Sequence, residues 1–344
     1  MTTTGVTGSP STREMVRTLA GRARRLLVLV VCAGFLASCG SSTPPGQGET
    51  GAVDRVTVRV LVLTMFDGET GPWLAHEKLT TSVDEPGAFA PLRCDPRGLC
   101  VATLGEGKAN AGTSLMAILL DRRLDLQHTV FLTAGIAGTP PSLGTLGFAA
   151  WSRWVVDWDL GHHLLPDSAP DVPHGYLPTH DEHTGVYHLN ETLSTLALTV
   201  TRNVTLSDSP EAAAERRHYP GQAGRQPFVT QCDTVSGDDF WAGSALSEAA
   251  QYITDLRTGR AGRYCTTAEE DSAVATALNR VGYLSRYLVL RTASDFDQPH
   301  PGQTMRALLS GFPGYRPAIE NAYRVGSTMA HHLIDHPAEA ARAG

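Results

Sequence analysis

Short apolar segments rich in β-branched residues alternate with helix-like segments over most of this 344-residue chain. The first, VTVRVLVLT at 56–64, has the composition of a strand buried on both faces of a sheet. Further strands are predicted at 130–134, 148–156, 228–234, 263–267 and 287–291, and helices at about 109–120, 189–200, 243–256, 269–284 and 318–334. This alternation predicts one α/β domain with a central, mostly parallel or mixed sheet flanked by helices.

The composition supports a globular protein that does not bind nucleic acid. Hydrophobic residues make up 42% of the chain and charged residues 18%, a balance that can form a core. The formal net charge is −7, and residues 1–39 contain five Arg and one Glu, so the remaining chain carries −11. An acidic chain of this kind lacks the basic surface that phosphate backbones require.

The N-terminal region has the pattern of a lipoprotein signal. Three arginines, Arg22, Arg24 and Arg25, precede an apolar run at 26–36 that is shorter than the roughly 20 residues of a membrane span. The run ends in LASC at 36–39, which is similar to a bacterial lipobox and makes Cys39 the lipid-bearing residue. We therefore expect a signal peptide at 1–39, a Ser/Pro/Gly-rich tether at 40–54 and a domain at 55–340.

Two alternatives stay open for the N-terminus, and one consequence follows from the signal. Met15 is an alternative start that gives a signal of conventional length, and an ordinary buried helix with a chance Cys would also fit the apolar run. The signal predicts an exported protein at the cell surface or periplasmic face, held to the membrane by its lipid anchor alone. In such a compartment the even set Cys94, Cys100, Cys232 and Cys265 indicates disulfides.

Five motifs follow predicted strands, at the sheet edge where α/β proteins bind ligands. In chain order they are GEGK at 105–108, TAGIAG at 133–138, VSGDDFW at 235–241, TAEEDSA at 267–273 and RTASD at 291–295, which continues as RTASDFD. The first is a weak signal alone, because it lacks the third Gly of a dinucleotide fingerprint and the Ser or Thr of a P-loop. An acid-containing turn is also predicted at 66–71.

Taken together, these motifs resemble the nucleoside phosphorylase and nucleosidase superfamily. The chain from about residue 56 to 335 is most similar to its purine nucleoside permease (NUP) branch, on TAEEDSA, RTASDFD and SGDDFW. The resemblance implies a single nucleoside phosphorylase-like domain that takes a purine nucleoside and needs no metal or other cofactor. The superfamily's sheet order also implies that Cys232 and Cys265 lie on neighbouring strands and form a disulfide. Cys94 and Cys100 flank a short turn, and we expect them to form the other disulfide.

The resemblance also assigns site residues. Asp295 falls on the acid that protonates the purine, Glu270 on the carboxylate that holds the ribose hydroxyls, and Phe240 on the aromatic ring that stacks on the base. Glu69 lies within about a residue of the carboxylate that activates water in the nucleosidases. We expect four further residues to contribute to substrate binding: Glu269, Arg291, Trp241 and Gly135.

Each of these residues also has a purely structural interpretation. TAEE at 267–270 is a capping box, and from this segment alone a helix cap is the preferred interpretation until the other motifs are considered. Asp295 could end a turn or cap a helix, Phe240 could be a core aromatic, and Arg291 could merely orient Glu270. Six histidines between His162 and His188 lie in a polar stretch without metal-site spacing, and no metal site is predicted there.

Two departures from the superfamily pattern bear on the reaction. Ile136 stands where many enzymes have Ser, and Glu269 where the nucleosidases have Met. Carboxylates at Glu106 and Glu269 would repel a phosphate dianion, so hydrolysis is favoured over phosphorolysis.

Three classes of function remain. The first is a nucleosidase or phosphorylase, and the second is a nucleoside-binding component that assists uptake through a separate membrane transporter. The third is a catalytically silent use of the fold, which the joint presence of Asp295, Glu270 and Phe240 disfavours. A homo-oligomer is compatible with each class.

The lipobox interpretation predicts that Cys39→Ala releases the protein from membranes, because no later segment is long and apolar enough to hold it there. Membrane fractionation of cells expressing the variant checks this. Membrane association equal to that of wild type would contradict the lipoprotein prediction.

Overall fold

A computed structural model describes residues 55–179 and 184–343. The chain divides into two units, 1–51 and 52–344, and all described residues belong to the second. The predicted signal peptide, Cys39 and the whole predicted tether at 40–54 lie outside the described residues. In the part described, no helix is both long enough and apolar enough to span a membrane.

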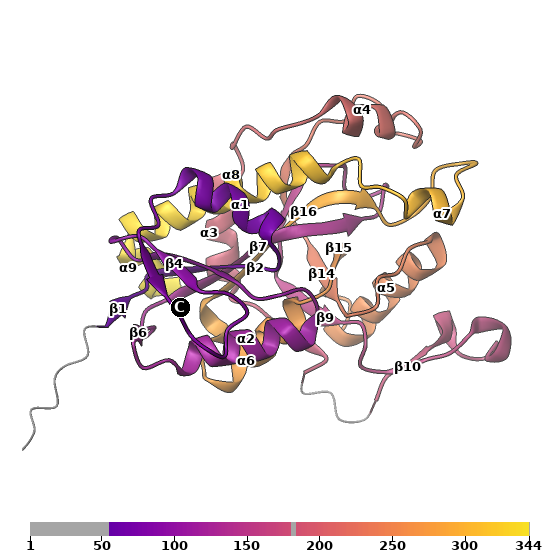
Figure 1. Ribbon diagram of the computed structural model, residues 1–344. Coiled ribbons are helices and arrows are strands. Elements are labelled where there is room, and N and C mark those ends of the chain that lie inside the picture. The colour runs from indigo at the N-terminus through magenta and orange to yellow at the C-terminus, as the bar shows by residue number, and fades with distance from the viewer. Residues whose placement is uncertain (1–54, 180–183, 344) are drawn as a thin grey trace, which may run out of the picture. The chain divides into compact units, whose positions relative to one another are not determined.

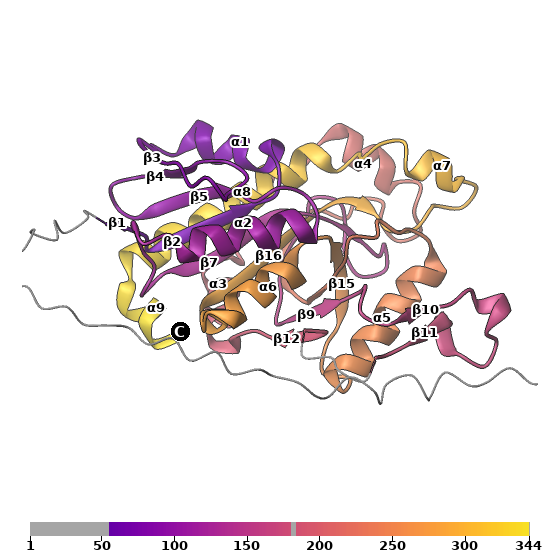
Figure 2. The ribbon, with the colours of Figure 1, turned by 60° about the horizontal axis from the view of Figure 1, so that its bottom comes forward.

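The fold is a mixed β-sheet between two layers of helices (Figures 1 and 2), as the alternation of segments predicted. The strands are β1 Val56–Thr57, β2 Val60–Thr64, β3 Thr81–Val83, β4 Leu92–Cys94, β5 Leu99–Thr103, β6 Leu124–Asp125, β7 Val130–Thr139, β8 Ala149–Trp151, β9 Trp154–Asp157, β10 His162–His163, β11 Tyr176–Leu177, β12 Val186–His188, β13 Val229–Gln231, β14 Asp233–Ser236, β15 Tyr264–Ala268 and β16 Tyr287–Phe296. The helices are α1 Asp67–His76, α2 Lys108–Leu120, α3 Glu191–Thr201, α4 Pro210–Arg216, α5 Ser244–Thr258, α6 Asp271–Arg280, α7 Met305–Leu308, α8 Tyr315–Asp335 and α9 Pro337–Ala343, with short 3₁₀ turns at Pro166–Ser168, Pro173–Gly175 and Leu284–Arg286.

Alternate residues of β2 enter two different cores, which explains its continuous apolar sequence. Leu61 and Leu63 pack into the core that α2 and α6 cover. Val60 and Val62 pack into the opposite core, beneath α1, α3 and α8. Successive side chains of a strand point to opposite faces, so a strand between two helical layers must be apolar at every position.

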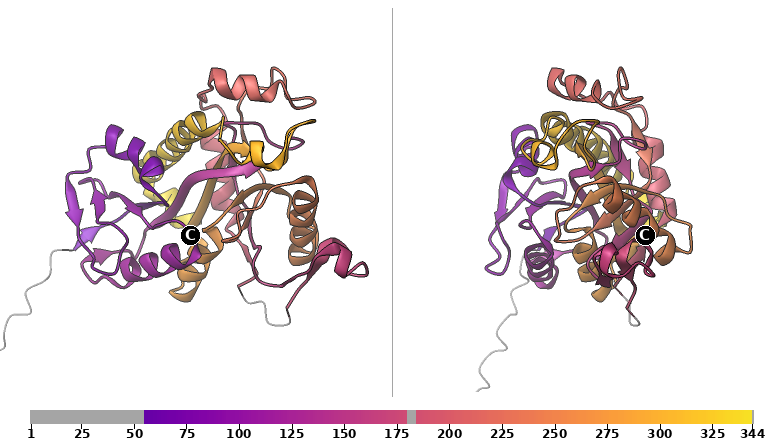
Figure 3. Two further views of the ribbon diagram at one scale, coloured as in Figure 1. Left: turned by 45° about the vertical axis from the view of Figure 1, so that its right-hand side comes forward. Right: turned by 90° about the vertical axis from the view of Figure 1, so that its right-hand side faces the viewer.

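The sheet path runs β12-β9-β14-β15-β7-β2-β5-β4-β3, and β16 pairs with β7 and β8. β2, β5, β7 and β16 are mutually parallel where they pair, whereas β15 meets β7 antiparallel at a single position. The polar, histidine-containing segment of residues 158–179 projects from this sheet (Figures 1 and 3).

Three local predictions were wrong. The segment 66–71, predicted as a turn from its glycines, begins helix α1, where Asp67 and Glu69 occupy the first turn and Trp73 is fully buried. Acidic side chains are favourable at a helix N-terminus, and the burial of Trp73 outweighs the low helix propensity of Gly and Pro. The sequence around Arg216, Arg217 and Arg225 likewise predicts a basic loop, but this segment contains α4, which Ser209 caps by accepting a hydrogen bond from Ala212 N.

The third wrong prediction concerns the ends of two strands. β7 and β16 were expected to stop near residues 134 and 291, but they continue to Thr139 and Phe296. They pair in parallel over this extra length, with one register shift between Ala293 and Asp295. The TAGIAG and RTASD motifs are therefore strand segments rather than loops, because their backbones satisfy each other's hydrogen bonds beyond the main sheet.

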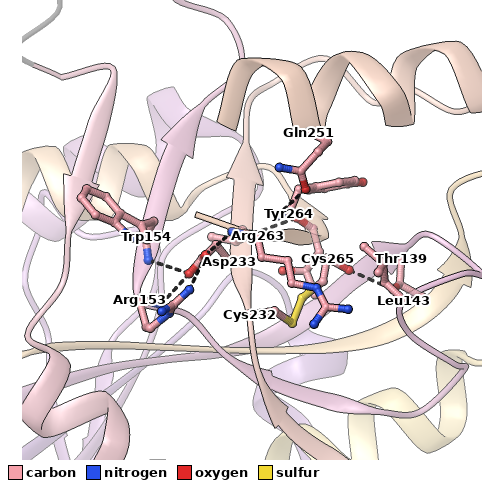
Figure 4. The surroundings of a disulfide bond; sticks show 12 residues. Thr139, Leu143, Arg153, Trp154, Cys232, Asp233, Gln251, Arg263, Tyr264 and Cys265 are labelled. Atoms are coloured by element: carbon pink, nitrogen blue, oxygen red, sulfur yellow. Dashed lines mark hydrogen bonds and ion pairs between the residues drawn. A yellow bond between two sulfur atoms is a disulfide. The ribbon is translucent and has the colours of Figure 1, made fainter. Parts of the chain in front are cut away.

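Both predicted disulfides are present. Cys94 and Cys100 lie opposite each other on β4 and β5, and Cys232 and Cys265 join the start of β14 to β15. Figure 4 shows that Asp233 lies beside the second disulfide, where its carboxylate accepts backbone hydrogen bonds from Arg153, Trp154 and Arg263. Asp233 and the disulfide therefore hold the starts of β9, β14 and β15 together.

Candidate functional site

A pocket of about 370 Å³ opens where β7 and β16 extend past the sheet. Its volume is in the range of pockets that hold small ligands. It is lined by seven of the residues singled out in the sequence: Glu69, Phe240, Trp241, Glu269, Glu270, Arg291 and Asp295. These come from four separate segments of the chain, so folding brings the motifs together at one edge of the sheet.

Arg291 organises the inner wall of the pocket. The guanidinium is 2% exposed and donates two hydrogen bonds to Asp271, at 2.8 and 3.0 Å, in a bidentate pair. It also donates to Glu270 at 3.1 Å and to the carbonyl of Ile136 at 3.0 Å. Charges this deeply buried must be paired, so Arg291, Asp271 and Glu270 form one structural unit.

Glu270 is held by this unit rather than by its own helix. One carboxylate oxygen accepts from Arg291, and the other accepts from Gly107 N at 3.2 Å. Glu270 makes no capping hydrogen bond at the start of α6, so the capping-box interpretation of TAEE is wrong. Burial raises the pKa of Glu270, and the charge of Arg291 opposes that rise.

Glu69 lies in the first turn of α1 and is 3% exposed. Its two oxygens accept backbone hydrogen bonds from Met65 and Ile136, each at 2.7 Å. Burial raises the pKa of Glu69 to about 7, against the lowering effect of Arg291. A carboxylate with this pKa can exchange protons near neutral pH.

Asp295 stands on the opposite part of the pocket wall, near the end of β16. Ser294 donates a hydrogen bond to it at 2.6 Å. Burial raises the pKa of Asp295 to about 7, although the Ser294 hydrogen bond lowers it. The side chain therefore retains a proton at neutral pH far more often than an ordinary Asp does.

The glycine-rich loop at 105–108 contributes backbone shape but no free cation. Gly105 and Gly107 have φ values of 89° and 85°, which side-chain-bearing residues rarely adopt. The Lys108 ammonium forms hydrogen bonds with Asp157 at 2.6 Å and Asp159 at 2.9 Å. Partial burial lowers the pKa of Lys108, but these two carboxylates raise it further, so the net shift is upward.

Aromatic side chains form the mouth of the pocket. Phe240 is 54% exposed, and its ring meets that of Phe312 edge to face at 6.1 Å, so the interpretation of Phe240 as a core residue is wrong. Trp241 is buried and stacks on Trp158 at 5.0 Å. An exposed ring over a polar pocket can stack on a planar ligand.

The pocket wall is strongly acidic. Among the described lining residues, six carry carboxyl groups and one, Arg291, carries a positive charge, and the six are Glu69, Glu106, Asp239, Glu269, Glu270 and Asp295. Burial, followed by the charges of Glu270 and Glu106, raises the pKa of Glu269 to about 7. Such a wall disfavours an anionic ligand.

Several residues of this site were not identified from the sequence. Asp271 and the partners of Lys108 act through contacts with other segments, although TAEEDSA contains Asp271. Ser294 of RTASDFD acts on its neighbour Asp295. Phe312 and Tyr315 also line the pocket and belong to no motif.

Of the histidines in the polar stretch, His163 contacts Trp158 and His188 contacts Glu191. His180 and His183 lie outside the described residues. In the described parts of the chain, no three His, Cys, Asp or Glu side chains are arranged to hold a metal.

Comparison with known proteins places this site in a family. A profile of the purine nucleoside permease (NUP) family matches residues 57–343. The chain belongs to the purine nucleoside permease family. A "probable purine nucleoside permease" of Schizosaccharomyces pombe is 32% identical over 345 residues, covering 90% of this chain and 99% of the relative. A Candida albicans purine nucleoside permease is 28% identical over 305 residues, covering 81% of this chain and 75% of the relative.

Solved structures show the fold of this family member. The 5'-methylthioadenosine/S-adenosylhomocysteine nucleosidase of Neisseria meningitidis superposes with a TM-score of 0.52 at 16% identity, covering 81% of this chain and all of that one. The futalosine hydrolase of Helicobacter pylori gives a TM-score of 0.53 at 17% identity, covering 80% and 98%. The nucleoside phosphorylase-like fold predicted from the motifs is confirmed.

Gly135 lies behind the inner wall and provides a test of its geometry. A Cβ added there would lie 2.6 Å from Arg291 Nη1 and 2.7 Å from Glu69 Oε1, and neither side chain can withdraw without losing buried hydrogen bonds. We expect Gly135→Ala to lower the free energy of unfolding by roughly 1 to 3 kcal/mol and to weaken nucleoside binding. Calorimetric titration and thermal unfolding measure the two effects.

Gly71→Ala is the matched control. An added Cβ at Gly71 meets nothing within 4 Å, and Ala is favoured over Gly within helix α1. This variant should bind as wild type does and be no less stable. Equal behaviour of the two variants would contradict the proposed packing of Arg291 against Glu69.

Proposed function

We propose that this protein binds purine nucleosides and hydrolyses their N-glycosidic bond. The observation that carries the proposal is the gathering of Asp295, Glu69 and the Arg291–Glu270 pair around one pocket, where burial raises the pKa of Asp295 to about 7. The names of the relatives support a purine nucleoside as ligand, and both structural neighbours are named as hydrolytic enzymes.

The reaction requires a proton donor at the base and a nucleophile at the sugar. As the bond between C1' and the purine nitrogen breaks, the ribose gains oxocarbenium character and the purine gains negative charge. Asp295 transfers its proton to the departing purine, which leaves as the neutral base. Glu69 accepts a proton from the water whose oxygen bonds to C1', so the products are free base and ribose.

Glu270 is placed to hold the ribose. Each of its oxygens already accepts one hydrogen bond, from Gly107 or Arg291, and retains a lone pair for a sugar hydroxyl. Glu269, with its raised pKa, lies next to it on the same wall. Phe240 at the mouth would then cover the face of the base.

Hydrolysis fits the charges of the pocket better than phosphorolysis. Lys108, the basic residue of the glycine-rich loop, is neutralised by Asp157 and Asp159, and Lys108 N donates to Asp238 at 2.5 Å. Arg291 is committed to Asp271 and Glu270. A phosphate dianion would thus meet carboxylates without a free cation among the described lining residues.

The family name supports a second function, a nucleoside-binding component that assists transport without turnover. Such a component would act with a separate membrane transporter. In either role we propose an exported protein anchored through Cys39. The two functions differ in whether bound nucleoside is cleaved.

Replacing the acid separates catalysis from binding. We expect Asp295→Asn to reduce the rate of purine release by roughly two to four orders of magnitude, because the amide cannot protonate the leaving base, and to leave binding nearly unchanged. Wild-type release should be greatest near pH 7 and fall on both sides, because Asp295 loses its proton above about pH 7 and Glu69 takes one up below about pH 7. Steady-state kinetics and equilibrium binding with adenosine and inosine measure both.

Glu270→Gln is the contrasting variant. Its ribose hydrogen bonds exist in the ground state and strengthen in the transition state, so both binding and turnover should weaken. If wild type binds nucleosides without releasing base, and Asp295→Asn supports uptake as well as wild type does, the binding component replaces the enzyme.

A further inference from the structure

A second buried carboxylate lies two residues beyond Asp295. Asp297 is 1% exposed, and Phe296 between them packs the other way, onto Tyr219 with ring centroids 4.2 Å apart. Strand β16 ends at Phe296, and Asp297 follows directly, close enough for its charge to act on Asp295. Asp297 does not line the pocket, and the sequence motif RTASDFD gave it no role.

Hydrogen bonds distinguish the two carboxylates. Ser247 of α5 and Tyr264 of β15 each donate an O–H to Asp297 Oδ2 at 2.8 Å. Asp295 receives one such bond, from Ser294. Donated hydrogen bonds stabilise the charged form, and two nearby carboxylates resist ionising together, so Asp297 ionises first and Asp295 keeps the proton.

Asp297 is also fixed in place by its backbone. Its N–H donates to Thr139 at the end of β7, and its carbonyl accepts from Gly243 at the start of α5. The second carboxylate oxygen, Oδ1, is buried and has no hydrogen-bond partner among the described residues. The carboxylate charge of Asp297 therefore has a fixed position and little screening by water, so its electrostatic effect on neighbouring groups is strong.

We propose that Asp297 is a positioning residue whose negative charge, held by Ser247 and Tyr264, keeps the proton on Asp295. This inference rests on the proposed function, because it explains how the general acid is maintained at neutral pH. The pKa values are in the same order, about 6 for Asp297 and about 7 for Asp295, and the charge of Asp297 is one cause of the second value.

Other titratable groups face the pair. From the pocket, Asp295 faces the acidic wall and Arg291 described above. From the opposite side it borders a second cavity, which is lined by Glu211, Glu215, His218 and Tyr219. Tyr264 contacts Asp297 directly, and burial followed by the charge of Asp297 raises the pKa of Tyr264 well above its usual range. Both tyrosines therefore remain neutral donors.

The test is the ionisation of Asp295 itself, which needs no turnover. In protein labelled with ¹³C-aspartate, the Asp295 carboxyl signal is assigned by its loss in Asp295→Asn and is then titrated by NMR. Asp297→Asn keeps the side-chain size but removes the charge, so the midpoint for Asp295 should fall by about one pH unit. Asp297→Glu, which keeps the charge, should restore most of that shift.

Glu215→Gln is the matched control, because it removes one negative charge from the cavity on the far side of Asp295. We expect a much smaller shift for it. An unchanged midpoint in Asp297→Asn, or an equal shift in Glu215→Gln, would overturn the assignment. If Asp297→Asn does not fold, Tyr264→Phe removes one donor from Asp297 and should lower the Asp295 midpoint by a smaller amount, whereas no shift would overturn it.

This titration and the kinetic test fail separately. A protein that never cleaves nucleosides could still show the Asp297-dependent midpoint, and would refute only the proposed hydrolysis. A protein that cleaves nucleosides with an Asp295 midpoint independent of Asp297 would refute only this inference.

Discussion

The buried guanidinium of Arg291 is the interaction on which the site depends. It projects from β16 and compensates carboxylates from α6 and the turn before it, while bonding to the carbonyl of Ile136 on β7. Removing one member would leave uncompensated charge in a core position, which commonly costs about 3 to 5 kcal/mol. The same charge opposes the rise in pKa that burial causes in Glu69 and Glu270. Arg291 therefore both holds the inner wall together and adjusts how tightly its carboxylates bind protons.

The second constraint is the extra length of β7 and β16. Because these strands pair to Thr139 and Phe296, they hold Ile136, Arg291 and Asp295 along one rigid wall of the pocket. Side chains on paired strands are placed more firmly than side chains on loops. Asp295 and Arg291 consequently line the pocket from fixed positions, four residues apart on strand β16.

The pattern of strands and helices, the family and the disulfide partners could all be predicted from the sequence. The elements depend on local periodicity and the family on motif order, which a single chain displays. The even cysteine number indicated disulfides, and the sheet order implied by the resemblance indicated that Cys232 pairs with Cys265. The continuation of β7 from residue 134 to Thr139 and of β16 from residue 291 to Phe296 could not be predicted, because the glycine and serine residues there favour loops and only pairing between distant segments makes them strands. Helix α1 was missed for a similar reason, since the burial of Trp73 and Glu69 is a tertiary property.

For the site, the motifs identified which residues gather in the pocket but not what holds them. In TAEEDSA, Glu270 and Asp271 are adjacent acidic residues that both pair with Arg291, but only Glu270 lines the pocket. Nothing in the motif indicates this difference. The role of Lys108 could not be predicted either, because Asp157 and Asp159 lie about fifty residues away and neutralise it only in the folded chain.

The central claim is that water, activated in an acidic pocket, cleaves the nucleoside. The most direct measurement incubates the purified protein with inosine in H₂¹⁸O without phosphate and analyses the products by mass spectrometry. The account predicts free hypoxanthine and ribose that carries one ¹⁸O from the solvent. Intact inosine, or sugar released only as a phosphate ester when phosphate is added, would contradict it.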